Sequence, residues 1–281
     1  MTAVRSPGDG RWLADGERAR YSSSFGTAAA DYAEHRPTYA EAAVRWALEP
    51  VADRSPVRVL DLGAGTGKLT GTLIRLGAEV TAVEPDAAML AQLRRILPGV
   101  RALSGRAEDI PLPDGAADAV VAGQAAHWFD MDRTVPEIVR VLAPGGVAAG
   151  LWNVFNDRVD WVAGMHELLD ELVRDHVGGW LSTSPESYDA DAFGVGAGGG
   201  PFGASERAEF RNGLRHTAGS LVATIATHSG LLVMERPERD RVLARLRDYL
   251  SSRPETAAGQ FTLPMVTVVV RAVRGAPPRQ R

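Results

Sequence analysis

Apolar and polar positions alternate in blocks along the first half of the chain. Short runs rich in valine, alanine and leucine have the length of buried parallel strands, and they lie at 57–62, 79–83, 100–104, 118–123 and 147–152. The segments between them predict helices at 68–76, 87–97 and 134–142. Because strands and helices alternate, we expect an α/β fold with a doubly wound, mostly parallel sheet.

The second half of the chain adds fewer strands. Residues 161–176 carry apolar positions at helical spacing, and the glycine-rich stretch 194–203 predicts a flexible loop or lid. Further elements are expected as a sixth strand at 207–217, helices at 220–232 and 237–250, and a last buried strand at 261–270. With these strands the sheet has seven.

Composition narrows the class of protein. Of 281 residues, 45% are hydrophobic and 23% are charged, as in ordinary globular domains. The net charge of -4 gives no basic footprint for nucleic acid. The absence of cysteine excludes disulfides and thiolate metal sites. No apolar run has the length of a membrane span and no signal peptide is recognised, so we expect a cytoplasmic protein that does not bind membranes.

The strand 57–62 ends in three glycines at alternate positions, Gly63, Gly65 and Gly67, and a helix follows. Such a turn lets the backbone approach a cofactor closely. A dinucleotide fingerprint would need a third glycine where Lys68 stands, and a phosphate-binding P-loop fails at Leu62 and Leu69.

The pattern Asp61-x-Gly63-x-Gly65-x-Gly67, followed by Glu84 at the end of the next strand, resembles the first two motifs of class I S-adenosylmethionine-dependent methyltransferases. The segment 124–129, Gln-Ala-Ala-His-Trp-Phe, and the Leu-x-Pro-Gly-Gly at 142–146 are similar to the methyltransferase type 11 and trans-aconitate methyltransferase-like group. This resemblance covers about residues 25–152.

The resemblance implies a site for S-adenosylmethionine, with S-adenosylhomocysteine as product. Glu84, at the carboxyl end of its strand, is expected to accept hydrogen bonds from both ribose hydroxyls. Met89 would lie against the adenine and Ala107 and Glu108 beside it, although Met89 would also suit a core position. The full expected set is Tyr32, Arg36, Asp61, Gly63, Ala64, Gly65, Gly67, Glu84, Pro85, Met89, Ala107, Glu108 and Gln124.

The same resemblance places His127 and Trp128 on the acceptor side. His127 is the candidate general base, because an imidazole titrates near neutral pH. It could instead only form hydrogen bonds within its turn, and methyl transfer to an anionic acceptor often needs proximity and alignment alone. Trp152, Asn153, Tyr188 and His228 are further candidates for substrate contacts, although packing or a surface position is the stronger expectation for each of them.

The expected organisation is one structural domain. Its segments are a flexible tail at 1–20, N-terminal cap helices at 21–56, a cofactor-binding core at 57–153, a helical or lid-like substrate insert with the sixth strand at 154–258, and the last sheet strand at 259–274.

The expected function is methyl transfer from S-adenosylmethionine to an oxygen, or a nitrogen, of a small-molecule acceptor such as a carboxylic acid or secondary metabolite. The protein would be a monomer or a homodimer. No metal site and no hydrolase nucleophile motif is recognised. The alternatives are a non-catalytic S-adenosylmethionine-binding module, a nicotinamide-dependent oxidoreductase, and a nucleic-acid methyltransferase, which the charge disfavours.

Overall fold

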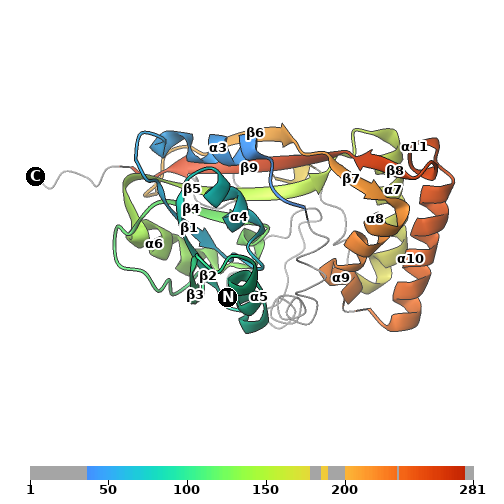
Figure 1. The fold of residues 1–281 in the computed structure, drawn as a ribbon, viewed down its shortest axis with the longest axis horizontal. Helices are drawn as coiled ribbons and strands as arrows, with labels where there is room; N and C mark the ends of the chain where they lie inside the picture. Colours follow the sequence, from blue (N-terminus) through green and yellow to red (C-terminus); the bar gives the residue numbers. More distant parts are fainter. Residues whose placement is uncertain (1–36, 178–184, 189–199, 233, 276–281) are drawn as a thin grey trace, which may run out of the picture.

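The structure, a computed structural model, describes residues 37–177, 185–188, 200–232 and 234–275. Its main feature is a seven-stranded sheet in the order β3-β2-β1-β4-β5-β9-β6 (Figure 1). The strands are β1 (Arg58–Leu62), β2 (Glu79–Glu84), β3 (Arg101–Ser104), β4 (Ala117–Gly123), β5 (Leu142–Phe155), β6 (Glu206–Arg211) and β9 (Met265–Val273). Strands β1 to β5 pair in parallel, and β9 runs antiparallel to both β5 and β6. The predicted mostly parallel, seven-stranded sheet is confirmed.

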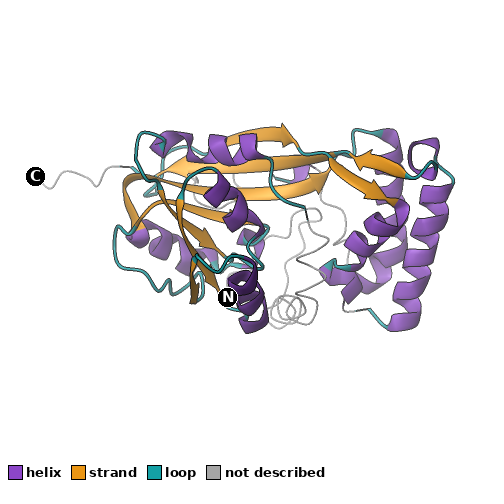
Figure 2. Ribbon diagram, in the orientation of Figure 1, coloured by secondary structure: helices purple, strands orange, loops and turns teal. Residues whose placement is uncertain are grey.

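Helices cover both faces of this sheet (Figure 2). They are α3 (Glu41–Leu48), α4 (Lys68–Arg75), α5 (Ala87–Ile96) and α6 (Met131–Val141), with short 3-10 turns at Glu49–Val51 and Ala126–Trp128. Successive residues of a strand point to opposite faces, so Val59 packs with α3 and α4 while Leu60 packs with α6. Only the part of the expected N-terminal cap from residue 37 on lies within the described residues.

A second group of elements packs at one end of the sheet (Figure 1). Outside this group, a 3-10 turn at Pro185–Ser187 leads to Tyr188, which packs in the core of the large sheet. The group comprises α7 (Asp160–Val177), α8 (Ala218–Ala226), α9 (Ser229–Leu232), α10 (Arg236–Ser251), α11 (Pro254–Ala257), and the two-stranded sheet of β7 (Leu214–Thr217) and β8 (Gln260–Leu263). These elements share their own apolar core, which includes Phe155 and Met265 from the ends of β5 and β9.

The sixth and last strands differ from the sequence-based prediction, because each is interrupted. The predicted strand 207–217 is β6 and β7, separated by Asn212 and Gly213, and the predicted strand 261–270 is β8 and β9, separated by Pro264. Proline cannot donate a hydrogen bond to a strand ladder, which explains the second break. The two breaks lie opposite each other in the paired strands, so one antiparallel ribbon passes from the large sheet into the small one.

Strand β5 extends beyond its predicted end at Trp152. Its last residues continue to pair with β9, with Phe155 opposite Met265. The sheet therefore reaches the helical group, and the ends of β5 and β9 form part of a wall beside the functional site described below.

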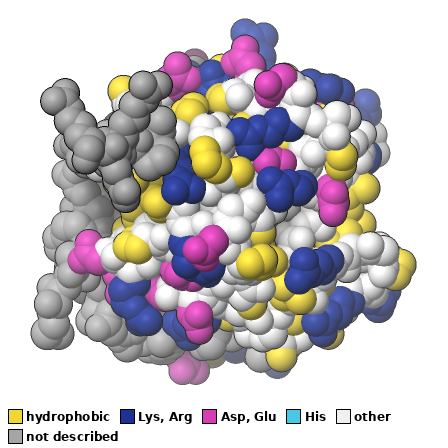
Figure 3. Space-filling model, turned by 90° about the vertical axis from the view of Figure 1, so that its left-hand side faces the viewer, with side chains coloured by type: hydrophobic (Ala, Val, Ile, Leu, Met, Phe, Trp, Pro, Cys, Tyr) yellow, Lys and Arg dark blue, Asp and Glu magenta, His cyan; other side chains and the backbone are white. Residues whose placement is uncertain are grey.

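Within the described ranges, no helix combines the length and apolar character that crossing a membrane requires. Figure 3 shows basic and acidic side chains interspersed on the described part of one face.

Candidate functional site

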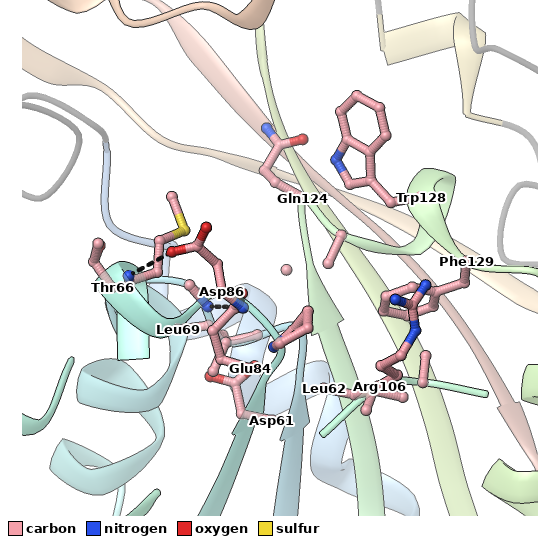
Figure 4. A pocket seen from close by; sticks show the side chains of 18 of the residues that line it. Asp61, Leu62, Thr66, Leu69, Glu84, Asp86, Arg106, Gln124, Trp128 and Phe129 are labelled. Carbon is pink, nitrogen blue, oxygen red and sulfur yellow. Dashed lines mark hydrogen bonds between the residues drawn. The ribbon is translucent and has the colours of Figure 1, made fainter. Parts of the chain in front are cut away.

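A cavity of about 320 Å³ opens at the carboxyl ends of β1, β2 and β4, and we call it the strand-end cavity. Its volume suits a small-molecule ligand. Most of the predicted site residues line it: Asp61, Gly63, Ala64, Gly65, Glu84, Pro85, Met89, Ala107, Glu108, Gln124 and Trp128. Figure 4 shows Asp61 and Glu84 on one side of the cavity and Gln124 and Trp128 on the other.

The glycine turn at the base of this cavity is held by β2. The N–H groups of Gly63 and Ala64 donate to the carbonyl of Val83 at 2.9 and 3.1 Å. Gly63 has a φ of 70°, and a Cβ there would lie 2.7 Å from the Cβ of Ala125. Gly67 caps α4 and faces Leu93, so this predicted residue does not line the cavity.

Glu84 is fixed by the backbone around it. Its Oε2 accepts a hydrogen bond from the N–H of Gly65, and its Oε1 accepts one from the N–H of Asp86, both at 2.8 Å. Burial raises the pKa of Glu84, and these two N–H groups act in the opposite direction. Because a carboxylate oxygen has two lone pairs, each oxygen can still accept a hydrogen bond from a ligand.

Asp61 is the most deeply buried carboxylate of the cavity wall, with 0% of the residue exposed. The hydroxyl of Thr70 on α4 donates to its Oδ2 at 2.5 Å, whereas its Oδ1 has no hydrogen-bond partner in the described part of the chain. Burial raises the pKa of Asp61 to about 7, the Thr70 hydrogen bonds oppose this, and the charge of Glu84 adds to it. A buried carboxylate oxygen without a partner fits a cationic ligand group.

Gln124 marks the opposite wall, where β4 ends. Its φ of 53° is left-handed, a conformation that non-glycine residues rarely adopt and that is concentrated at functional sites. Its backbone N–H donates to the carbonyl of Leu151 at 2.9 Å, and its Nε2 donates to the carbonyl of Asn153 at 2.7 Å. Gln124 is therefore held rigidly against the end of β5.

Further around the cavity lies a mostly apolar slot with one acidic residue. Met89 and Ala107 are buried, with 6% and 5% of each residue exposed. The Oε1 of Glu108 accepts a hydrogen bond from the N–H of Asp130 at 3.0 Å, and Arg106 forms an ion pair with Glu108. Apolar walls beside fixed polar groups suit an aromatic base.

A smaller cavity, which we call the side cavity, lies next to the strand-end cavity. Tyr39, Lys68 and Gln124 line both cavities. Further residues of the side cavity come from the end of β5, from α8 and the turn after it, from both sides of the interrupted ribbon and from the segment before α3. They are Asn153, Val154, Phe155, Leu214, His216, Thr224, His228, Leu263, Met265 and Pro37. A ligand in the strand-end cavity and a second one in the side cavity would thus share a wall.

Some predicted residues lie elsewhere. Trp152 is 1% exposed and stacks on Tyr188, with ring centroids 4.7 Å apart, so it belongs to the core and lines neither cavity. His127 also lines neither cavity, and its ring lies 4.8 Å from that of Trp128, which does. The geometry does not support His127 as a base, and that role stays a prediction. Tyr32 and Arg36 lie outside the described residues.

Several residues of the cavity walls lie outside the predicted set, among them Tyr39, Lys68 and His216. Lys68 had a detectable signal, because it directly follows the glycine turn and is the only lysine in the chain. His216 had none, because the predicted strand 207–217 gave no reason to separate it from its neighbours.

The comparisons with known proteins agree on one enzyme class. Residues 60–150 match a family model described as a methyltransferase domain. An uncharacterized methyltransferase of Mycobacterium tuberculosis is 40% identical over 261 residues, which are 91% of this chain and 97% of that protein. A malonyl-[acyl-carrier protein] O-methyltransferase of Methylococcus capsulatus is 40% identical over 97 residues, 32% of this chain and 35% of that protein. A solved structure of a candidate type II methyltransferase from Anaeromyxobacter dehalogenans has a TM-score of 0.65 and 26% identity, and the match covers 86% of this chain and 99% of that one.

Proposed function

This chain belongs to the S-adenosylmethionine-dependent methyltransferases, and from that premise we propose that it methylates a carboxylate oxygen of a small molecule bound in the side cavity. The observation that carries the proposal is the wall shared by the two cavities at Tyr39, Lys68 and Gln124. It brings an acceptor next to a methyl donor. The similarity of 97 residues of this chain to a malonyl-[acyl-carrier protein] O-methyltransferase also supports a carboxylate acceptor.

The residues of the strand-end cavity fit the donor. S-adenosylmethionine carries a cationic amino group, a ribose with two hydroxyls and an adenine, and when bound it supplies a methyl group on a sulfonium. Asp61 has a buried oxygen in need of a cationic or hydrogen-bonding partner, and Glu84 has free lone pairs for the ribose hydroxyls. Met89, Ala107 and Glu108 are proposed to hold the adenine.

The acceptor side requires little proton chemistry. A carboxylate is already anionic at neutral pH, so this chain has to hold it in line with the methyl group and to exclude water. Phe155, Leu263 and Met265 supply apolar walls for this purpose. A general base, the role predicted for His127, would be needed only for an acceptor that is neutral before reaction.

Calorimetric titration with S-adenosylhomocysteine, with NADH as the control ligand, tests the donor site. We expect micromolar-range binding of the first ligand alone. Transfer of a labelled methyl group to a panel of carboxylic acids, with the esters identified by mass spectrometry, tests the acceptor. Methylation of amines or alcohols but of no acid would contradict the carboxylate proposal, and donor binding with no transfer to any acceptor class would favour a non-catalytic module.

Affinity for S-adenosylhomocysteine should fall as the pH decreases below about 7. In the free protein Asp61 becomes protonated below its pKa of about 7, whereas an amino group prefers the ionised carboxylate. Binding then requires release of a proton, so Kd should rise by about tenfold per pH unit below the pKa. Titrations between pH 5.5 and 8 measure this. In Asp61→Asn the affinity should be lower at pH 8, and only the weaker dependence due to Glu84 should remain; an unchanged slope would contradict the assignment.

A further inference from the structure

Lys68 is the first residue of α4 and lies where the two cavities meet. Its side chain is half-buried, and within the described ranges it forms no hydrogen bond and no ion pair. Arginines of the described chain often pair with carboxylates, for example Arg54 with Asp118 and Arg271 with Glu206. A half-buried ammonium without a partner is therefore an exception that calls for a ligand.

The carboxylates of the strand-end cavity do not compensate this charge. Glu84 accepts hydrogen bonds from the N–H groups of Gly65 and Asp86, and Asp61 accepts one from the hydroxyl of Thr70. Neither of these two carboxylates is within ion-pair distance of Lys68. Burial lowers the pKa of Lys68, and in the part of the chain that the structure describes no neighbouring acid offsets that effect. An anionic ligand group would both supply hydrogen-bond acceptors and restore the favourable charged state.

The side cavity determines what else such a ligand contains. Apart from Lys68, its walls are mainly apolar, and they include Val154, Phe155 and Leu263. The amide of Asn153 is already occupied, since its Oδ1 accepts from Thr267 and Asn212 and its Nδ2 donates to the carbonyl of Thr38. The volume of about 50 Å³ corresponds to the space of on the order of four water molecules. It suits a short apolar body.

We propose that Lys68 binds the carboxylate of the methyl acceptor, and that the acceptor is a short acid whose apolar body occupies the side cavity. This inference rests on the proposed function, because it names the substrate class of the same site. His216 and His228 also line the side cavity and would contact the body of the acid.

The charge balance of the reaction gives Lys68 a distinctive kinetic signature. One carboxylate oxygen forms a bond to the methyl carbon, the bond between that carbon and sulfur breaks, and its electron pair remains on sulfur. The products are a neutral ester and a neutral thioether, and no proton moves. Because the carboxylate loses charge along the way, its pairing with Lys68 stabilises the bound acid more than the transition state. Lys68 should therefore lower KM and favour release of the ester without raising kcat.

Lys68→Met retains the length of the side chain and removes its charge. The matched control is Arg75→Met at the other end of the same helix, because the Arg75 side chain is 53% exposed and lines neither cavity. Hexanoate and hexanamide serve as probes, titrated at pH 7.5 into the protein saturated with S-adenosylhomocysteine. We expect hexanoate to bind the parent and Arg75→Met alike, to bind Lys68→Met at least about tenfold more weakly, and hexanamide to bind weakly to all three. Turnover of an acid acceptor should show the same rise in KM with kcat within a few-fold.

Equal affinity of Lys68→Met and the parent for hexanoate would overturn the proposal, as would failure of the parent to bind any short acid tested. A loss of affinity for S-adenosylhomocysteine in Lys68→Met, with acid binding unchanged, would assign Lys68 to the carboxylate of the donor instead. A different result would contradict the proposed function: the acid would bind in a Lys68-dependent way but would never be methylated. Circular dichroism of each variant verifies that the fold is retained.

Discussion

Glu84→Gln should weaken the binding of S-adenosylhomocysteine by about a hundredfold or more. Hydrogen bonds to a charged group contribute about 1.5–3 kcal/mol each, and two ribose hydroxyls would lose a charged acceptor. A loss of about 3 kcal/mol corresponds to about a hundredfold in Kd. The substitution also disturbs the glycine turn, because a glutamine can accept a hydrogen bond from only one of the N–H groups of Gly65 and Asp86 through its single oxygen. Calorimetry measures the affinity.

Glu79→Gln is the control for this experiment. Glu79 begins the same strand and is exposed, so its substitution removes the same charge far from the cavity. Affinity of Glu79→Gln should equal that of the parent protein. If Glu84→Gln bound the ligand as tightly as Glu79→Gln, Glu84 would have no role in holding the ribose.

Gly63→Ala should lower the free energy of unfolding by about 2–5 kcal/mol and abolish donor binding. A left-handed backbone costs a residue with a Cβ about 1–2 kcal/mol, and overpacking adds about 1–3 kcal/mol. The overpacking arises because the new methyl group would lie 2.7 Å from the Cβ of Ala125 and 3.3 Å from Phe129. The turn that brings the N–H of Gly65 to the carboxylate of Glu84 would then have to move. Urea unfolding and ligand titration measure the two effects.

Gly65→Ala is the matched comparison, because its φ of 56° imposes a similar backbone cost while the nearest atom, the Sδ of Met89, is 3.7 Å away. It should lose only about 1–2 kcal/mol of stability. Adding Ala125→Gly to Gly63→Ala should recover most of the overpacking cost. Equal stabilities of Gly63→Ala and Gly65→Ala would show that the close approach to Ala125 is unimportant.

The donor half of the site could be predicted from the sequence because its determinants are local. The turn after β1 needs glycine at Gly63, Gly65 and Gly67, and these stand at fixed spacing from a buried strand. Glu84 could be placed because it ends the next strand, and neighbouring parallel strands bring their carboxyl ends to one edge of the sheet. Asp86 follows as the N-cap of α5, where its Oδ1 accepts from the N–H groups of Ala88 and Met89.

The acceptor half depends on contacts between distant segments, and there the sequence was less informative. Trp128 follows one buried strand and Trp152 ends the next predicted one, yet the first lines the strand-end cavity and the second stacks on Tyr188 in the core. The break of the ribbon at Gly213 and Pro264 brings Leu214 and Leu263 to the side cavity. Periodicity shows which face of an element is apolar, but it does not show which other element covers that face.

By itself, the sequence determined the order of strands and helices along the chain, the glycine turn and the position of Glu84 at the end of the next strand. These features are set by residues that are neighbours along the chain. Only the tertiary structure decided that Lys68 lies between two cavities with no partner among the described residues. It also decided that Tyr39 packs closely on Gly123, where a Cβ would be 2.5 Å from the Tyr39 hydroxyl. Such relations depend on how far each strand extends and on which segments meet beyond its end, and long-range packing fixes both.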